Sequence, residues 1–139
     1  MVQNTTGQVS LSQEPLYHRG VELYRAGEFF ACHEVLEELW TPMRGPHRLF
    51  LQALIHFAVA FYHQQQHNPR GAVKQLTKAL RKLQGYLPAY EGVDTATLYR
   101  EGQDCLERIL AGDKPAPPRI RESAEMQGAI DSFLGHRRE

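Results

Sequence analysis

The chain carries no net charge and few cysteines, and these absences exclude several classes of protein. Sixteen Lys and Arg residues balance sixteen Asp and Glu residues among 139 in total, which argues against a protein built mainly to hold nucleic acid or acidic membranes. The two cysteines, Cys32 and Cys105, lack the spacing of a metal or redox site. We therefore expect no disulfide framework and a reduced, cytoplasmic protein.

Long apolar segments are also missing. Residues 1–14 are polar and contain no apolar core of a signal peptide. The longest apolar stretch, residues 49–62, is interrupted by Gln52 and His56, so it is too short and too polar to span a bilayer, and we expect no membrane partner. No glycine-rich phosphate loop, nucleophile elbow or His-Glu-x-x-His motif is present, and no segment alternates like a strand.

The residues that are present predict an all-α, single-domain bundle of about five to six helices. Prolines at first helical positions and glycines after the ends delimit helices over residues 15–26, 29–40, 47–67, 69–86 and 94–111. Residues 47–67 are apolar almost all round, which is typical of a buried central helix. We expect a flexible arm over 1–14, the helical domain over 15–112, and an extended proline-rich segment over 113–139 that ends in a short helix or tail.

Two ionisable residues of the helix over 29–40 lie on its mostly apolar face. At 100° per residue, His33 and Glu37 point to the same side, whereas Glu34 and Glu38 point away. An ionised carboxylate rarely enters a protein interior without a partner. His33 is the nearest candidate partner for Glu37.

The central helix carries one narrow polar stripe, formed by Gln52, His56 and His63. Because a short loop joins this helix to the preceding one, the two should pack together, and we expect the stripe to meet His33 and Glu37 in one buried cluster. The aromatic walls of this predicted cluster would be Phe29, Trp40 and Tyr62. The candidate ligand-binding residues are His33, Glu37, Trp40, Gln52, Tyr62 and His63. The candidate metal ligands are His33, Glu37, His56 and His63.

Several functions fit such a cluster. It can be a structural hydrogen-bond network that fixes a helix crossing, or a pocket for a small ligand. Histidine and glutamate also suit a divalent ion such as zinc, iron or manganese. A metal-dependent, hydrolase-like enzyme would then use Glu37 as base or ligand and His63 as ligand or acid.

Two further alternatives come from other helices. The helix over 69–86 has five basic residues and no acidic one up to its end, so it could bind nucleic acid or phosphate. The lack of interleaved aromatics favours a solvated face, or one that pairs with Glu34 and Glu38 or with a second subunit. Residues 23–29 are similar to a tetratricopeptide turn, which leaves open a module for a peptide or partner protein, although no 34-residue period is sustained.

Two sequence blocks resemble a bacterial family known as "domain of unknown function 309". The first is Gly27-Glu28-Phe29-Phe30 followed by His-Glu-Val-Leu-Glu-Glu-Leu-Trp over residues 33–40. The second is Gln-Ala-Leu-Ile over 52–55, then Ala58, Ala60, Tyr62-His63 and the Asn-Pro-Arg-Gly-Ala cap over 68–72. At position 56 this chain has His where the family pattern more often has Gln. The resemblance covers roughly residues 15–110 and implies an all-helical, cytoplasmic domain of uncharacterised activity.

Overall fold

The computed structural model describes residues 10–123 of the chain and confirms an all-α single domain. Two short 3-10 helices accompany the five α-helices of this part of the chain. The elements are η1 Leu11–Gln13, α1 Pro15–Arg25, α2 Phe29–Trp40, α3 His47–Gln65, α4 Pro69–Leu83, η2 Gln84–Tyr86 and α5 Thr95–Leu110. Within residues 10–123, β-pairing is limited to two isolated bridges, both of which involve Val93.

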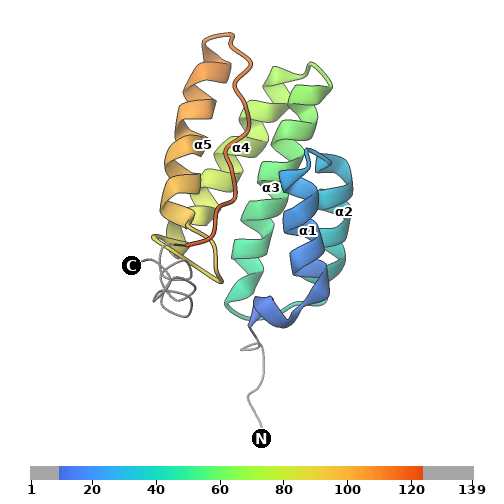
Figure 1. Ribbon diagram of the computed structural model, residues 1–139. Coiled ribbons are helices and arrows are strands. Elements are labelled where there is room, and N and C mark those ends of the chain that lie inside the picture. Colours follow the sequence, from blue (N-terminus) through green and yellow to red (C-terminus); the bar gives the residue numbers. More distant parts are fainter. Residues whose placement is uncertain (1–9, 124–139) are drawn as a thin grey trace, which may run out of the picture.

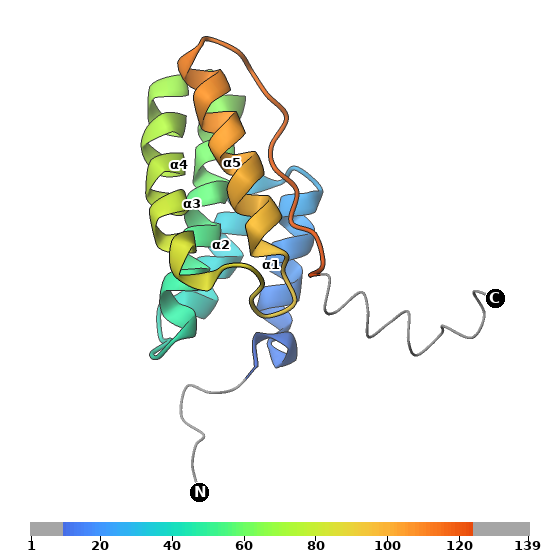
Figure 2. The same cartoon turned by 90° about the vertical axis from the view of Figure 1, so that its left-hand side faces the viewer.

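The helices form two layers (Figures 1 and 2). One layer consists of α2, α3 and α4, with α3 in the middle. The other side is covered by α1, by α5 and by residues 113–123, an extended segment that we call the strap. The strap runs back along α5 (Figure 1), and at its end the Ser123 N–H donates to the carbonyl oxygen of Gly92, in the loop before α5, at 2.9 Å.

The central helix α3 supplies much of the core, as its apolar sequence predicts. Phe50, Phe57 and Phe61 are all essentially inaccessible to solvent. The helix ends at Gln65, two residues before the predicted end, because His67 adopts a positive φ of 58°. Asn68 then caps α4, and its side chain accepts a hydrogen bond from the backbone N–H of Gly71.

The N-terminal residues of the described chain are more ordered than the predicted flexible arm. Leu11 is fully buried, and its backbone N–H donates to Glu91 Oε1 at 2.7 Å. This contact ties the start of the bundle to the loop before α5. Residues 1–9 of that arm lie outside the described residues, as does the short helix or tail predicted at the end of the segment over 113–139.

Side chains of α1 and α5 bind the backbone of the strap. The Tyr24 hydroxyl donates to the carbonyl oxygen of Pro118 at 2.7 Å, and Arg25 Nε donates to that of Ile120 at 3.0 Å. The Cys105 thiol donates to the carbonyl oxygen of Ala116 at 3.2 Å. A proline-rich segment that forms no secondary structure is thereby held against the bundle.

None of the helices within residues 10–123 combines the length and the hydropathy that crossing a membrane requires.

Candidate functional site

His33 and Glu37 lie together, but at the surface. His33 Nε2 is 3.4 Å from Glu37 Oε1, and 49% of the Glu37 side chain is exposed. The other ring nitrogen of His33, Nδ1, is 3.2 Å from the carbonyl oxygen of Phe30. The carboxylate of Glu37 is therefore solvated, and the burial predicted for it is wrong.

The polar stripe of α3 turns toward α4 rather than toward α2. His56 Nδ1 lies 2.8 Å from Gln75 Oε1, and Lys82 Nζ lies 2.9 Å from His56 Nε2. Since an ammonium group can only donate, Nε2 is the acceptor and Nδ1 carries the proton that His56 donates to Gln75. Desolvation by burial lowers the pKa of His56, and the nearby charge of Lys82 lowers it further.

His63 also faces α4, at the helix start. Its Nδ1 is 3.3 Å from Asn68 Nδ2, and a Cβ added at Gly71 would stand 2.9 Å from its Cγ. Gln52, on the same stripe, is partly buried. His56 and His63 are thus held by groups on or just before α4, while His33 pairs with its own helix.

The predicted buried cluster between α2 and α3 does not form, and helix packing gives the reason. The face of α2 that is buried is wholly apolar, with Phe29, Cys32, Leu36 and Leu39. Phe29 lies 6.1 Å from Phe61 of α3, measured between ring centroids. His33 and Glu37 are left at the outer edge of that contact, where water solvates the Glu37 carboxylate at little energetic cost. The polar stripe of α3 lies beside α4 instead.

The same helix packing separates the four residues that were predicted to bind a metal ion. Among residues 10–123, no group of three or more His, Cys, Asp or Glu side chains is placed so that it could hold a metal ion. The predicted set divides between the α2 edge, with His33 and Glu37, and the α4 edge, with His56 and His63.

Trp40 and Tyr62, the predicted walls, lie in aromatic contacts at the edge of α2 and α3. The guanidinium carbon of Arg48 stacks 4.0 Å from the centroid of the Trp40 ring. The Trp40 Nε1 is buried and has no hydrogen-bond partner among the described residues. The ring of Tyr62 lies 5.2 Å from that of Phe30, centroid to centroid.

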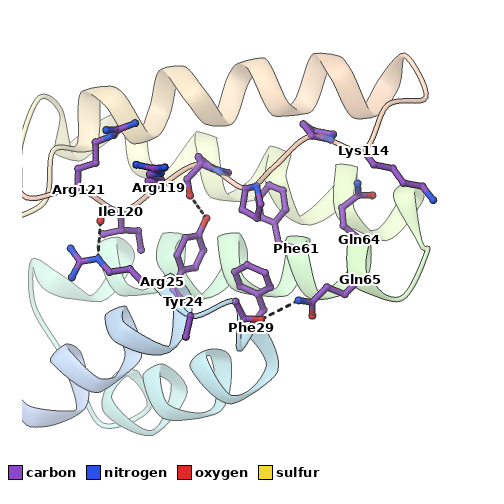
Figure 3. A pocket seen from close by; sticks show the side chains of 15 residues that line it. Tyr24, Arg25, Phe29, Phe61, Gln64, Gln65, Lys114, Arg119, Ile120 and Arg121 are labelled. Carbon is purple, nitrogen blue, oxygen red and sulfur yellow. Dashed lines mark hydrogen bonds between the residues drawn. The ribbon is translucent and has the colours of Figure 1, made fainter.

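A cleft of about 870 Å³ opens instead under the strap. It lies between the α1–α2 turn, the C-terminal half of α3 and residues 114–121 (Figure 3). The rings of Tyr24, Phe29 and Phe61 line its inner side, and the Tyr24 and Phe29 centroids are 5.1 Å apart. We call this cavity the strap cleft. Its volume falls within the usual range for small-molecule sites.

The charged residues that line the strap cleft are all basic: Arg25, Lys114, Arg119 and Arg121. Arg25 pairs with Glu22 at 2.9 Å, and Arg121 pairs with Glu101 at 3.1 Å. The side chains of Lys114 and Arg119 form no ion pair with any residue in the described part of the chain. They are the cations that remain available to a ligand.

Reasoning from the sequence missed this cleft, although its parts left signals. Gly27, with a φ of 78°, makes the tight turn that the sequence predicts, and Gln65 Nε2 donates to its carbonyl oxygen at 3.0 Å. The sequence also predicts an extended proline-rich segment from residue 113. What the sequence does not show is that this segment folds back beside the turn, about ninety residues earlier in the chain.

Comparison with known proteins agrees with the resemblance seen in the sequence. Residues 17–75 match the family described as "Domain of unknown function (DUF309)". The chain is also similar to the "Uncharacterized protein YpuF" of Bacillus subtilis (strain 168), with 34% identity over 93 residues. That alignment covers 64% of this chain and 53% of the relative, so the chain spans about half the length of the curated relative it matches.

Proposed function

We propose that this chain, whose residues 17–75 match the DUF309 family, binds a small organic anion with an apolar body in the strap cleft. The observation that carries the proposal is the pairing of an aromatic inner side with a charged rim of one sign. An apolar ligand body would lie against accessible lining residues such as Pro117, above the buried rings of Phe29 and Phe61. A carboxylate, sulfonate or phosphate group would meet Lys114 and Arg119.

The ion pairs of the four basic residues that line the cleft support this assignment of Lys114 and Arg119 to the anionic group. Arg25 and Arg121 are tied to Glu22 and Glu101, so their role is to hold the strap and add to the positive potential. Lys114 and Arg119 have no such partners among the described residues and can turn toward a ligand. A neutral ligand would gain the apolar contacts alone and bind more weakly.

Two dyes that differ by one sulfonate group test the proposal. Anilinonaphthalene sulfonate carries the anion, and N-phenylnaphthylamine is the same aromatic body without it. Binding of each dye to the full chain is followed by fluorescence titration. Because both cations are exposed, we expect the double variant K114A/R119A to weaken binding of the sulfonate about three- to tenfold. Binding of the neutral dye should not change.

The controls separate the cleft from other surfaces. R100A removes an exposed cation outside the cleft and should change neither titration. Gln64→Trp places a large side chain in the cleft wall and should weaken both dyes. If K114A/R119A and R100A have the same effect, or if Gln64→Trp has none, the strap cleft is not the binding site.

We also propose that this function is carried out in the cytoplasm, and the state of the cysteines supports this. Both are free thiols and both are buried. Burial raises the pKa of Cys32 to about 12 and that of Cys105 to about 11. Thiols that stay protonated and covered do not need an oxidising compartment. A fluorescent fusion of the full chain, followed by fractionation of the cells, would test this localisation.

A further inference from the structure

The outer face of the α2–α3–α4 layer is open, because α1, α5 and the strap all lie on its other side (Figure 2). Helix α3 lies between α2 and α4, so these two helices form opposite edges of the face. Leu49, His56 and His63 follow one another at intervals of seven residues along α3, so they lie on the stripe that runs down the middle of the face.

The two edges carry charges of opposite sign. Helix α2 contains Glu34, Glu37 and Glu38 and neither Lys nor Arg, and all three carboxylates are exposed. Helix α4 contains five basic residues and no Asp or Glu. Its basic residues are Arg70, Lys74, Lys78, Arg81 and Lys82.

These charges do not neutralise one another within the described part of the chain. The ion pair of Glu37 is with His33, and none of the five basic residues of α4 pairs with a carboxylate there. The helix between the two edges carries one Lys or Arg, Arg48, whose guanidinium donates to the carbonyl oxygens of Trp40 and Met43. Both edges therefore remain free to meet an oppositely charged surface.

Exposed apolar side chains add to the same face. Phe30, on the α2 edge, is 48% exposed, and Leu49, on the stripe of α3, is 51% exposed. Large apolar groups at this exposure are common singly on protein surfaces, but here they lie on the face where the charges are also unpaired. Burying them would favour association.

We propose that this face binds a second copy of the same chain, with a two-fold axis parallel to α3. Such an axis places α2 of each copy against α4 of the other and forms the contact twice, as an isologous interface requires. The registers also agree. Glu34 and Lys74 are each the sixth residue of their helix, and Glu37 and Lys78 each lie about one turn further on.

Charge reversal at either edge should weaken this dimer. E34K/E37K makes the contact positions of α2 basic, like those of α4, and K74E/K78E makes the contact positions of α4 acidic, like those of α2. In each variant, like charges therefore meet at both contacts of the dimer. We expect each to raise the dissociation constant about tenfold or more, measured by sedimentation equilibrium of the full chain. The dissociation constant of the unaltered chain should also rise with salt, because the contacts are ionic.

An equimolar mixture of the two variants is the decisive measurement. In a mixed dimer, the reversed positions of α2 in one copy meet the reversed positions of α4 in the other, and both contacts are attractive again. We expect the mixture to recover a dimer about as stable as that of the unaltered chain, to within roughly threefold. No other pairing of these edges predicts that two repelling variants associate with each other.

A matched control and a folding check complete the test. D104K/E107K reverses two exposed acids one turn apart on α5, outside the face, and should leave the dimer unchanged. Circular dichroism melting checks that each variant is folded. If the unaltered chain is monomeric, the proposal is wrong and the face would bind a different molecule. If the mixture of the two folded variants stays monomeric, the proposal is also wrong.

Discussion

The two faces of this bundle use charge in opposite ways. The strap cleft places basic residues around an apolar hollow with no carboxylate in its lining. The outer face of the α2–α3–α4 layer has acids on one edge and bases on the other, with a half-buried histidine stripe between them. Charge of one sign around a cavity suits a small anion, whereas separated opposite charges on a broad face suit another macromolecule.

The faces also differ in which parts of the chain build them. The predicted site residues lie between positions 33 and 63, inside the segment that matches the family. They belong to the outer face or to its margin. The strap cleft, in contrast, depends on residues 114–121, outside that match. The predicted site residues and the cavity are therefore largely separate features of the molecule, although Gly27 and Phe29 of the first signature block line the cleft.

A substitution in the contact of α1 with α2 should disturb both faces together. A Cβ at Gly20 would clash with the buried side chain of Leu36, so we expect Gly20→Val to lower the free energy of unfolding by about 3 kcal/mol or more. Chemical denaturation measures this loss. Gly85→Val is the matched control, because no heavy atom lies within 4 Å of a Cβ there. Equal losses at both positions would mean that α1 and α2 do not pack so closely.

A smaller change should affect the strap cleft alone. Tyr24→Phe removes the hydroxyl that donates to the carbonyl oxygen of Pro118 at 2.7 Å, and the unpaired carbonyl should lower the free energy of unfolding by about 1–2 kcal/mol. We also expect weaker binding of anilinonaphthalene sulfonate, with self-association unchanged. Tyr99→Phe, which loses an exposed contact with Gln84, should have little effect. A Tyr24→Phe protein that melts and binds like the unaltered chain would show that the strap does not depend on this bond.

The smallest effect concerns the outer face and depends on pH. Burial lowers the pKa of His56 below its ordinary value of 6.5, and the charges of Lys82, Lys78 and Arg81 lower it further. The unfolded chain therefore takes up a proton more readily than the folded one, so stability is lost as pH falls below about 6.5.

His56→Gln should reduce this loss at acid pH, because glutamine can still hydrogen-bond to Gln75 and Lys82 but does not titrate. Melting temperatures measured across the acid range compare the two proteins. His18→Gln, at an exposed position, serves as the control. If the melting temperatures of His56→Gln and His18→Gln fall equally as the pH is lowered, the environment of His56 does not contribute to the loss of stability in acid.

The helix boundaries could be predicted closely because local signals define them. The sequence places a cap at 68–72 and a helix start at residue 94, and the side chains of Asn68 and Asp94 accept hydrogen bonds from backbone N–H groups of the first turns of α4 and α5. Gly27 and Gly112 were expected as stops, and both have positive φ. The site could not be predicted in the same way. The angular position of Glu37 places it at the edge of the apolar face, where a small rotation of the helix decides between interior and solvent.

The sequence by itself determined the helices, their order and the burial of α3, because these follow from local capping and from apolar periodicity. It also placed His33 beside Glu37, since a helix brings residues four apart together. Only the tertiary structure decided that this pair is solvated, that His56 turns to Lys82, and that the strap closes a cleft over Phe61. Those outcomes depend on helix rotation and on contacts between residues far apart in sequence, which no local pattern records.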